Sequence, residues 1–390
     1  MRDYAYTPYR EYREVRPAGT RPNTRKKKRR KRRKNRTLLL SLVLLVLLGS
    51  AVLIYQFLFN KAESIVSMEP TPISTDSTYL NTGDGILYQT DGQIHFYHLK
   101  DSKKNYNYGM GASDIRMSGS SNMTVVFNSA SLQVIGEKEP ISFTGEVREV
   151  ECGREYLAVL RRGADGADSV IIQTPAGEQI GEPLAFPDEY VVDFGFYTVG
   201  GEKLWIESLN VNAGIPSTTI STYDLGKQSI TGVMNIQGQL IDKVYVTADS
   251  MFVIATNQII RYTHDGNKEV YREMIYGYEV VDCSNASGTP TFLMTPRGGD
   301  FHTVKVIALT EGGESDAVET YLQLPAEGVD AFIMGSRLVV ASREKLFTYT
   351  TKGKLSSTAA FEQPIDTAIK LNDSVLMLSS NGTYYLASID

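Results

Sequence analysis

The chain has 390 residues, of which 42% are hydrophobic and 22% are charged, and its formal net charge is −5. This average hides two unlike parts: residues 1–36 hold 16 basic and 3 acidic residues, whereas the rest holds 24 basic and 42 acidic residues. Such asymmetry indicates two environments. The net negative charge of the residues after 36 excludes attraction of nucleic acid or anionic lipid to this part by charge alone.

The N-terminal tail, residues 1–36, has almost no apolar residues besides tyrosine, so it cannot bury a core and we expect it to be disordered in solution. Tyr4, Tyr6, Tyr9 and Tyr12 lie among its charges. Aromatic residues in such a tail can dock a cytoplasmic partner, and a passive tail is the alternative. The tail ends in a basic block made of Arg25, Lys26, Lys27, Lys28, Arg29, Arg30, Lys31, Arg32, Arg33, Lys34 and Arg36.

An uncharged apolar run, residues 37–59, follows the basic block directly. As a helix it would be roughly 35 Å long, enough to cross a hydrocarbon core of about 30 Å. The run is too long for a cleaved signal peptide, so it predicts a signal-anchor helix. Positive charge stays on the cytoplasmic side. We therefore expect a single-pass protein of the cell membrane with its N-terminus in the cytoplasm and its C-terminal domain outside.

The basic block is best interpreted as a topology signal that also attracts anionic lipid at the cytoplasmic face. A contact with nucleic acid or a ribosome is the alternative, and we expect no nucleic-acid partner. Residues 60–79 are polar and include Pro70 and Pro72, which predicts a stalk between the membrane and the outer domain.

The outer domain, residues 80–390, is rich in Val, Ile, Tyr, Phe and Thr and is interrupted by Gly, Asn and Asp, which is typical of short antiparallel strands. A repeat of about 40 residues fits the four-stranded blade of a β-propeller. We expect eight blades, or seven if the first and last fragments share one, with a strand near 78–82 closing the ring; an array of β-sandwiches is the alternative. One strand of each unit begins at Gly85, Asn122, Glu155, Glu202, Asp249, Thr289, Ser336 and Asp373.

These units pair a Leu-x-Val-x-Ser strand, as at Leu338–Ser342, with a strand that ends in a glycine turn, as at Gly226 and Gly353. They resemble the quinoprotein-like and WD40-like propellers. The combination of basic tail, single anchor and outer propeller is similar to an uncharacterised membrane-anchored family of Gram-positive bacteria with a domain of unknown function. Quinoprotein repeats carry a docking tryptophan in each blade, whereas this chain has only Trp205. The resemblance therefore implies the propeller fold and no quinone.

Chemical motifs are scarce. Cys152 and Cys283 occupy equivalent places three units apart, which predicts two free thiols rather than a disulfide. His95 and His98 are three residues apart on a predicted strand, so they point to opposite faces and form no chelate. Asp168 is expected in a solvated turn. We predict no catalytic residues, no cofactor-binding residues and no metal site.

The function that these features favour is a non-catalytic protein-interaction scaffold at the cell envelope, with an envelope protein as partner. Loops at 195–202, 210–217, 286–290 and 296–300 are the expected contact surfaces. A glycan-active hydrolase or lyase that uses carboxylates at the propeller mouth is one alternative, and a transmembrane ligand sensor is another.

Overall fold

The structure is a computed structural model, and it describes residues 43–50, 64–109, 115–212, 214–286, 288–298, 303–309, 317–325 and 327–389. The chain divides into two compact units, Met1–Ala62 and Glu63–Asp390. In the first unit, residues 43–50 form a helix with exposed leucine side chains. Among the described residues no helix is both long and apolar enough to cross a membrane. The basic block and most of the run 37–59 lie outside the described residues.

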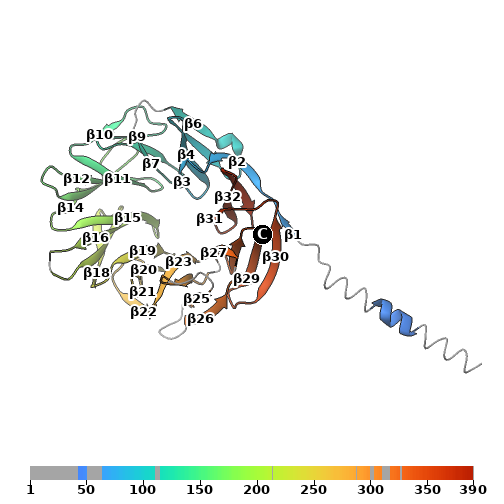
Figure 1. Cartoon of the computed structure of the whole chain (residues 1–390). Helices are drawn as coiled ribbons and strands as arrows, with labels where there is room; N and C mark the ends of the chain where they lie inside the picture. Colours follow the sequence, from blue (N-terminus) through green and yellow to red (C-terminus); the bar gives the residue numbers. More distant parts are fainter. Residues whose placement is uncertain are drawn as a thin grey trace, which may run out of the picture. The chain divides into compact units, whose positions relative to one another are not determined.

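The second unit is a ring of eight antiparallel sheets, so the prediction of an eight-bladed β-propeller is confirmed, and the seven-bladed and sandwich alternatives are wrong (Figure 1). The blades are numbered 1 to 8 in chain order. Each blade has four strands, with a fifth added at the outer edge of blade 7, and its first strand faces the centre of the ring. A four-stranded sheet cannot bury both faces alone, and packing the sheets around an axis buries them.

The strands of the first four blades follow the chain from the centre outward. Blade 1 consists of β3 (Thr78–Asn81), β4 (Gly85–Thr90), β5 (Gln93–His98) and β6 (Tyr106–Gly109), with the short 3-10 helix η1 (Ser102–Lys104) between the last two. Blade 2 consists of β7 (Arg116–Gly119), β8 (Thr124–Phe127), β9 (Ser131–Val134) and β10 (Ile141–Ser142). Blade 3 consists of β11 (Glu146–Cys152), β12 (Leu157–Arg162), β13 (Asp168–Gln173) and β14 (Leu184–Phe186). Blade 4 consists of β15 (Tyr190–Thr198), β16 (Glu202–Asn210), β17 (Ser217–Asp224) and β18 (Ser229–Gln237).

The remaining blades repeat this order. Blade 5 consists of β19 (Ile241–Val246), β20 (Ser250–Ala255), β21 (Gln258–Thr263) and β22 (Glu269–Met274). Blade 6 consists of β23 (Tyr278–Ser284), β24 (Thr291–Pro296), β25 (Thr303–Leu309) and β26 (Ala317–Gln323). Blade 7 consists of β27 (Gly328–Met334), β28 (Arg337–Ser342), β29 (Lys345–Thr350) and β30 (Leu355–Phe361), and blade 8 begins with β31 (Thr367–Asn372), β32 (Val375–Ser380) and β33 (Thr383–Ser388).

The ring is closed by two strands from the segment predicted as a stalk, so the boundary drawn at residue 80 is wrong. β2 (Glu69–Ser74) pairs with β33 and completes blade 8, and β1 (Ser64–Val66) adds in parallel to β30 of blade 7. The strand expected to close the ring, β3, belongs instead to blade 1. Pro70 and Pro72 fit in β2 because it is an outer-edge strand, where missing N–H groups cost no ladder hydrogen bonds.

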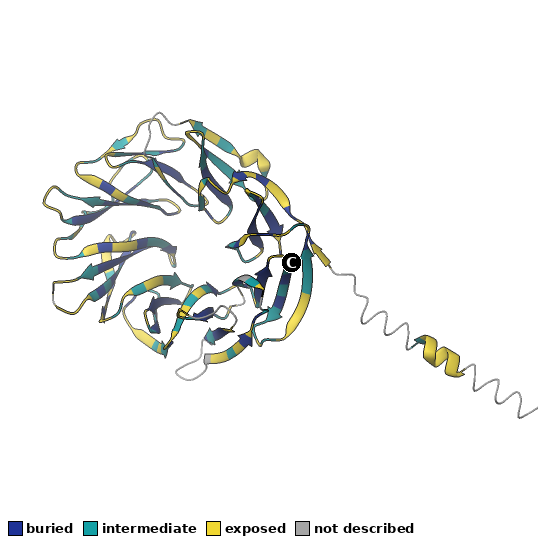
Figure 2. Ribbon diagram, in the orientation of Figure 1, coloured by how far each residue is buried: buried dark blue, intermediate teal, exposed yellow. Residues whose placement is uncertain are grey.

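The core lies between the blades. The second strands β12, β20 and β32 are buried along most of their length because neighbouring blades cover both of their faces, and the outermost strands are partly exposed (Figure 2). Apolar clusters fill successive interfaces, as where Leu160 and Val170 of blade 3 meet Phe194 and Ile206 of blade 4. All the described clusters lie within the second unit, which therefore contains the apolar cores it needs to fold by itself.

Candidate functional site

The inner strands share a local irregularity that positions acidic side chains. Six of the eight, those of blades 3 to 8, have a β-bulge in their pairing with the second strand. A bulge inserts one unpaired residue and changes the face to which the following side chains point. Glu149, Asp193, Asp282 and Asp330 each follow the bulge of their strand directly.

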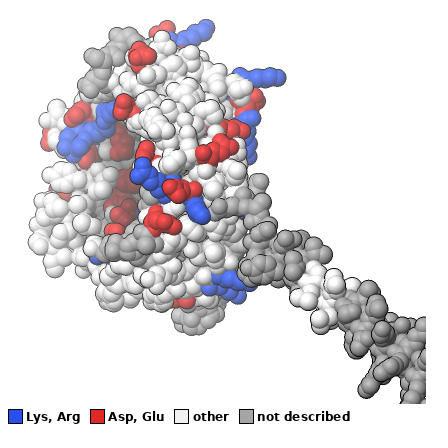
Figure 3. Space-filling view, turned by 45° about the vertical axis from the view of Figure 1, so that its right-hand side comes forward, with Lys and Arg blue, Asp and Glu red and all other residues white. Residues whose placement is uncertain are grey.

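Five carboxylates of blades 3, 4 and 5 form what we call the acidic wall. Figure 3 shows acidic side chains gathered in a hollow of the propeller. Glu149 and Glu151 lie two residues apart on the same side of β11, and Asp193 lies directly opposite Glu207 in the pairing of β15 with β16. The wall consists of Glu149, Glu151, Asp193, Glu207 and Asp242.

The carboxylates of the wall raise one another's pKa values. Burial raises the pKa of Glu151 to about 8, and the charges of Glu149 and Asp193 add to the effect. Burial likewise raises the pKa of Glu207 to about 7, with contributions from Asp193 and Asp242. Each ionised carboxylate is costly because the wall both desolvates it and places like charges beside it.

The wall lacks matching positive charge. None of the ion pairs between described residues involves its five members. Arg116 and Arg148 lower the pKa of Glu149, but burial and Asp193 outweigh them and the net shift is upward. Glu207 is only 5% exposed, and no hydrogen bond or ion pair between described residues satisfies its carboxylate.

The inner strands on the other side of the ring are neutralised. Lys370 of β31 lies with its Nζ 3.0 Å from an Asp282 carboxylate oxygen and 3.1 Å from one of Asp373. The same ammonium group donates to the Ile333 carbonyl at 2.6 Å. Asp282 also accepts a hydrogen bond from the backbone N–H of Ile333, and Asp330 accepts one from Ala368, each in the next blade. These acids tie neighbouring blades together.

A second feature is an exposed apolar patch at one end of blade 4, which we call the end patch. It consists of Tyr190, Val211, Ile215 and Leu240, whose exposed fractions run from 48% to 65%. The loop 211–216 joins β16 to β17, and the backbone N–H of Gly238 donates to the carbonyl of Pro216 at 3.0 Å. This bond holds the loop beside the segment that carries Leu240.

The loops predicted as contact surfaces lie at both ends of the ring. Strands alternate in direction within a blade, so the loops after second strands lie at one end and those after first strands lie at the other. The loop 211–216 and the residues 297–298 that follow β24 therefore share the end with the end patch, and the segment that follows β23 lies opposite. Most of the expected loop 195–202 is strand, because β15 extends to Thr198.

The thiols and histidines do not build a reactive site in the described residues. Cys152 and Cys283 are free and buried, as predicted. Burial raises the pKa of Cys152 to about 12 and that of Cys283 to about 11, so both are neutral at physiological pH. The Nδ1 atom of His95 lies 3.0 Å from the Oδ1 atom of Asn107. The described residues contain no group of three side chains arranged to hold a metal.

Asp168 is not in the solvated turn that the sequence predicts. It is buried in β13, where both of its oxygens bind the Arg162 guanidinium and one accepts the backbone N–H of Val191. Its role is to join blade 3 to blade 4. The topology residues of the basic block, Arg25 to Arg36, lie outside the described part of the chain.

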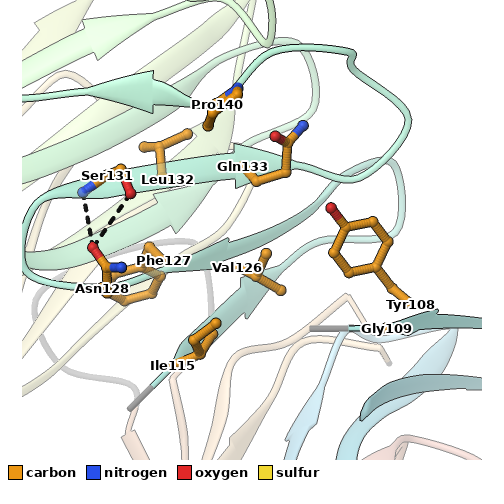
Figure 4. A pocket seen from close by; sticks show the side chains of 10 residues that line it. All are labelled: Tyr108, Gly109, Ile115, Val126, Phe127, Asn128, Ser131, Leu132, Gln133 and Pro140. Atoms are coloured by element: carbon orange, nitrogen blue, oxygen red, sulfur yellow. Dashed lines mark hydrogen bonds between the residues drawn. The ribbon is translucent and has the colours of Figure 1, made fainter. Parts of the chain in front are cut away.

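A small pocket of about 390 Å³ opens between blades 1 and 2 (Figure 4). Ile115, Val126 and Tyr108 line it on one side, and Gln133 faces them from β9. Asn128 is already occupied by the backbone and hydroxyl of Ser131. The amide nitrogen of Gln133 already donates to the carbonyls of Val134 and Glu137. The lining therefore offers mainly apolar surface, without a carboxylate or cation, and suits a neutral group rather than acid–base chemistry.

Comparisons with known proteins identify the family of the chain and structures with a similar fold. Residues 56–385 match a family described as a family of unknown function, DUF5711. No curated protein matches the chain. The structure is similar to the WD40 domain of SCAP from fission yeast, with a TM-score of 0.56, 10% identity, and coverage of 83% of this chain and 94% of that one.

Two further structures show the same fold. The C-terminal WD40 domain of Sif2 matches with a TM-score of 0.54 and 10% identity, over 84% of this chain and 99% of that one. The computationally designed Ika8 protein matches with a TM-score of 0.53 and 11% identity, over 84% and 100%. At these identities the likeness concerns the WD40-like propeller fold alone.

Proposed function

The chain belongs to that family of unknown function, and we propose that it is a single-pass membrane protein whose extracytoplasmic propeller is a non-catalytic protein-interaction scaffold at the cell envelope. The end patch carries this proposal. Four large apolar side chains stand exposed on loops and strand ends that a long, well-packed blade holds in place. Clustered exposed apolar residues mark protein contact sites, and rigid loops suit recognition.

Blade 4 supplies the rigidity. Its strands have eight or nine residues, whereas the strands of the other blades have at most seven. The hydrogen bond from Gly238 to Pro216 fixes the patch loop to the segment that follows β18 of the same blade. A preorganised apolar surface binds a partner at lower entropic cost than a flexible one.

The patch is tested by crosslinking and affinity capture from intact membranes. We expect Ile215→Asp together with Leu240→Asp to abolish specific capture, because two charges are placed at the centre of the contact. Leu355→Asp, at a residue 49% exposed on β30 of blade 7, is the matched control and should capture the same proteins. Equal capture by all variants would contradict the scaffold.

The orientation in the membrane rests on the sequence of residues 25–59. Thr75 lies exposed in the turn after β2, so Thr75→Cys should react with an impermeant thiol reagent on whole cells, and Thr20→Cys should not. The native thiols are buried and give little background. The reverse labelling pattern would overturn the topology.

The acidic wall favours a second candidate, a glycan-active hydrolase or lyase. Such an enzyme needs one protonated and one ionised carboxylate at neutral pH, with environments that push their pKa values apart. In the wall, Glu149, Glu151, Asp193 and Glu207 are all shifted upward. Upward shifts alone do not mark one of these carboxylates as the acid and another as the base, so we keep the scaffold as the conclusion.

A further inference from the structure

We propose that the acidic wall of blades 3 to 5 is a binding site for an extended cation, a flexible chain that carries several ammonium or guanidinium groups. The site is a feature of the hollow within the ring and is separate from the end patch. Two sources supply this chemistry, a free linear polyamine and a basic segment of a partner protein.

The spacing of the carboxylates favours an extended ligand over a single ion. The five acids come from three neighbouring blades, and like charges that shared one metal ion would have to converge on a point. Among the described residues no three such side chains converge in that way. A chain with charges several ångströms apart can instead pair with Glu149 and Glu151 on β11 and with the Asp193–Glu207 pair on β15 and β16.

Glu207 is the independent observation that points to a ligand. It lies on β16, the second strand of blade 4, and is 95% shielded from solvent. Its cross-strand partner is another acid, Asp193, and Asp242 of the next blade adds a third negative charge nearby. The carboxylate oxygens keep a little contact with solvent, but a carboxylate in so closed a place without a hydrogen bond or counter-ion is still costly. A cation bound along the wall would supply the missing partner.

Binding should release protons. Glu151 faces Glu149 and Asp193; Glu207 faces Asp193 and Asp242; Glu149 faces Asp193 together with the cations Arg116 and Arg148. The pKa values of about 8 and about 7 mean that Glu151 and part of Glu207 carry protons at pH 7. A bound ammonium group favours the ionised carboxylates and displaces those protons.

The test is isothermal titration calorimetry on residues 63–390 at pH 7, in two buffers of different ionisation enthalpy. The probes are spermidine, a hexapeptide that alternates lysine with glycine, and Ca²⁺. We expect saturable binding of spermidine, the peptide or both, with release of protons that the buffer comparison reveals. The double variant Glu151→Gln, Glu207→Gln should weaken this binding at least tenfold.

Glu139→Gln, at an exposed acid in the loop before β10, is the matched control and should bind like the unaltered protein. Binding of spermidine alone identifies a polyamine site, and binding of the peptide alone identifies a site for a basic protein segment. The proposal is wrong if neither cation binds, if Ca²⁺ alone binds, or if the double variant binds as tightly as the control. None of these outcomes depends on the end patch, so the scaffold and the cation site can fail separately.

Discussion

Inner strands on both sides of the ring carry an acidic residue directly after a β-bulge, but the acid has different partners on the two sides. Asp193 of blade 4, Asp282 of blade 6 and Asp330 of blade 7 occupy equivalent places directly after a bulge. Asp282 and Asp330 each accept a backbone N–H from the next blade, and Asp282 is also paired with Lys370. Among the described residues, Asp193 accepts a hydrogen bond only from the N–H of its own neighbour Phe194, and it faces Glu207.

The difference shows that the bulge and its acid are structural by default. On the side of the ring that carries Lys370, which we call the lysine side, Asp282 and Asp330 both join neighbouring blades, and the charge of Asp282 is also balanced by the lysine. On the acidic side Asp193, in the same position, faces the carboxylate of Glu207, and no ion pair between described residues involves it. Function is expected where one copy of a repeated stabilising arrangement differs from the others. Selection for stability alone would not keep carboxylates that lack a partner.

The largest change in stability is expected from removing the ammonium group of Lys370, which balances the acids on the lysine side. Lys370→Ala takes away the ammonium that Asp282 and Asp373 share and leaves both carboxylates in a half-closed site, where the lysine side chain is only 15% exposed. We expect a loss of about 3 kcal/mol in the free energy of unfolding, because the remaining acids stay desolvated and unpaired. Urea denaturation followed by tryptophan fluorescence measures it.

Lys227→Ala is the control for that loss. Lys227 also pairs with an aspartate, Asp224, but its side chain is 71% exposed. Its removal should cost less than about 0.5 kcal/mol, because water screens an exposed pair. Equal losses in the two variants would mean that the lysine side is not a buried balancing network.

A smaller effect of opposite sign, a gain in the free energy of unfolding, is expected when a carboxylate of the acidic wall is removed. The folded-state pKa of Glu151 is about 8, above its ordinary value of 4.5, so folding favours the protonated form. The stability that this group contributes is complete below pH 4.5 and is lost as pH rises through 8. Glu151→Gln should therefore raise the free energy of unfolding by about 1–2 kcal/mol at pH 9 and leave it unchanged at pH 4, once solvent screening of a half-buried group is allowed for.

The same reasoning places the transition for Glu207→Gln near pH 7, since the pKa of that carboxyl is about 7. Thermal melting from pH 4 to 9 measures both variants, with Glu139→Gln as the exposed control. A stabilisation that did not vary with pH would mean that repulsion between the ionised carboxylates of the wall does not lower the stability of the fold.

The sequence predicts the blades better than it predicts this contrast between the two sides. Period-two alternation and turn glycines recur along the domain because each blade meets the same packing problem, so strand positions could be predicted and the blade number narrowed to eight or seven. The closing strand was missed because Pro70 and Pro72 are typical of linkers, and only the pairing of β2 with β33 shows that they occupy an edge.

The acidic wall was missed because bulges interrupt the alternation on which sequence prediction relies. Without the bulge at Val192, Val191 and Asp193 would share a face; with it, Val191 packs in the core and Asp193 lies opposite Glu207. One signal was available. Among the described second strands, β16 is the one with an acid in its interior, whereas its equivalents such as β20 and β32 are apolar or neutral there.

The smallest effect concerns the thiols, one near each side of the ring. Cys152 is next to Glu151, whose charge adds to burial in raising its pKa to about 12. Cys283 reaches only about 11, because Lys243 and Lys370 oppose burial and the nearby acids. At pH 9 the thiolate fraction of Cys283 should therefore be higher than that of Cys152. Iodoacetamide should therefore alkylate the Cys152→Ser protein faster than the Cys283→Ser protein.

The lysines can be shown to cause that difference. Lys243→Met removes an exposed cation and should slow alkylation of Cys283 about two- to threefold without changing Cys152, whereas Lys227→Met should change neither. If Lys243→Met slowed both thiols equally, access through a shared opening motion would set the rates, and the charge contrast between the two sides would not extend to the ends of the inner strands. A selective effect would show that Lys243 contributes positive potential at Cys283, whereas Cys152 has the like charge of Glu151 beside it.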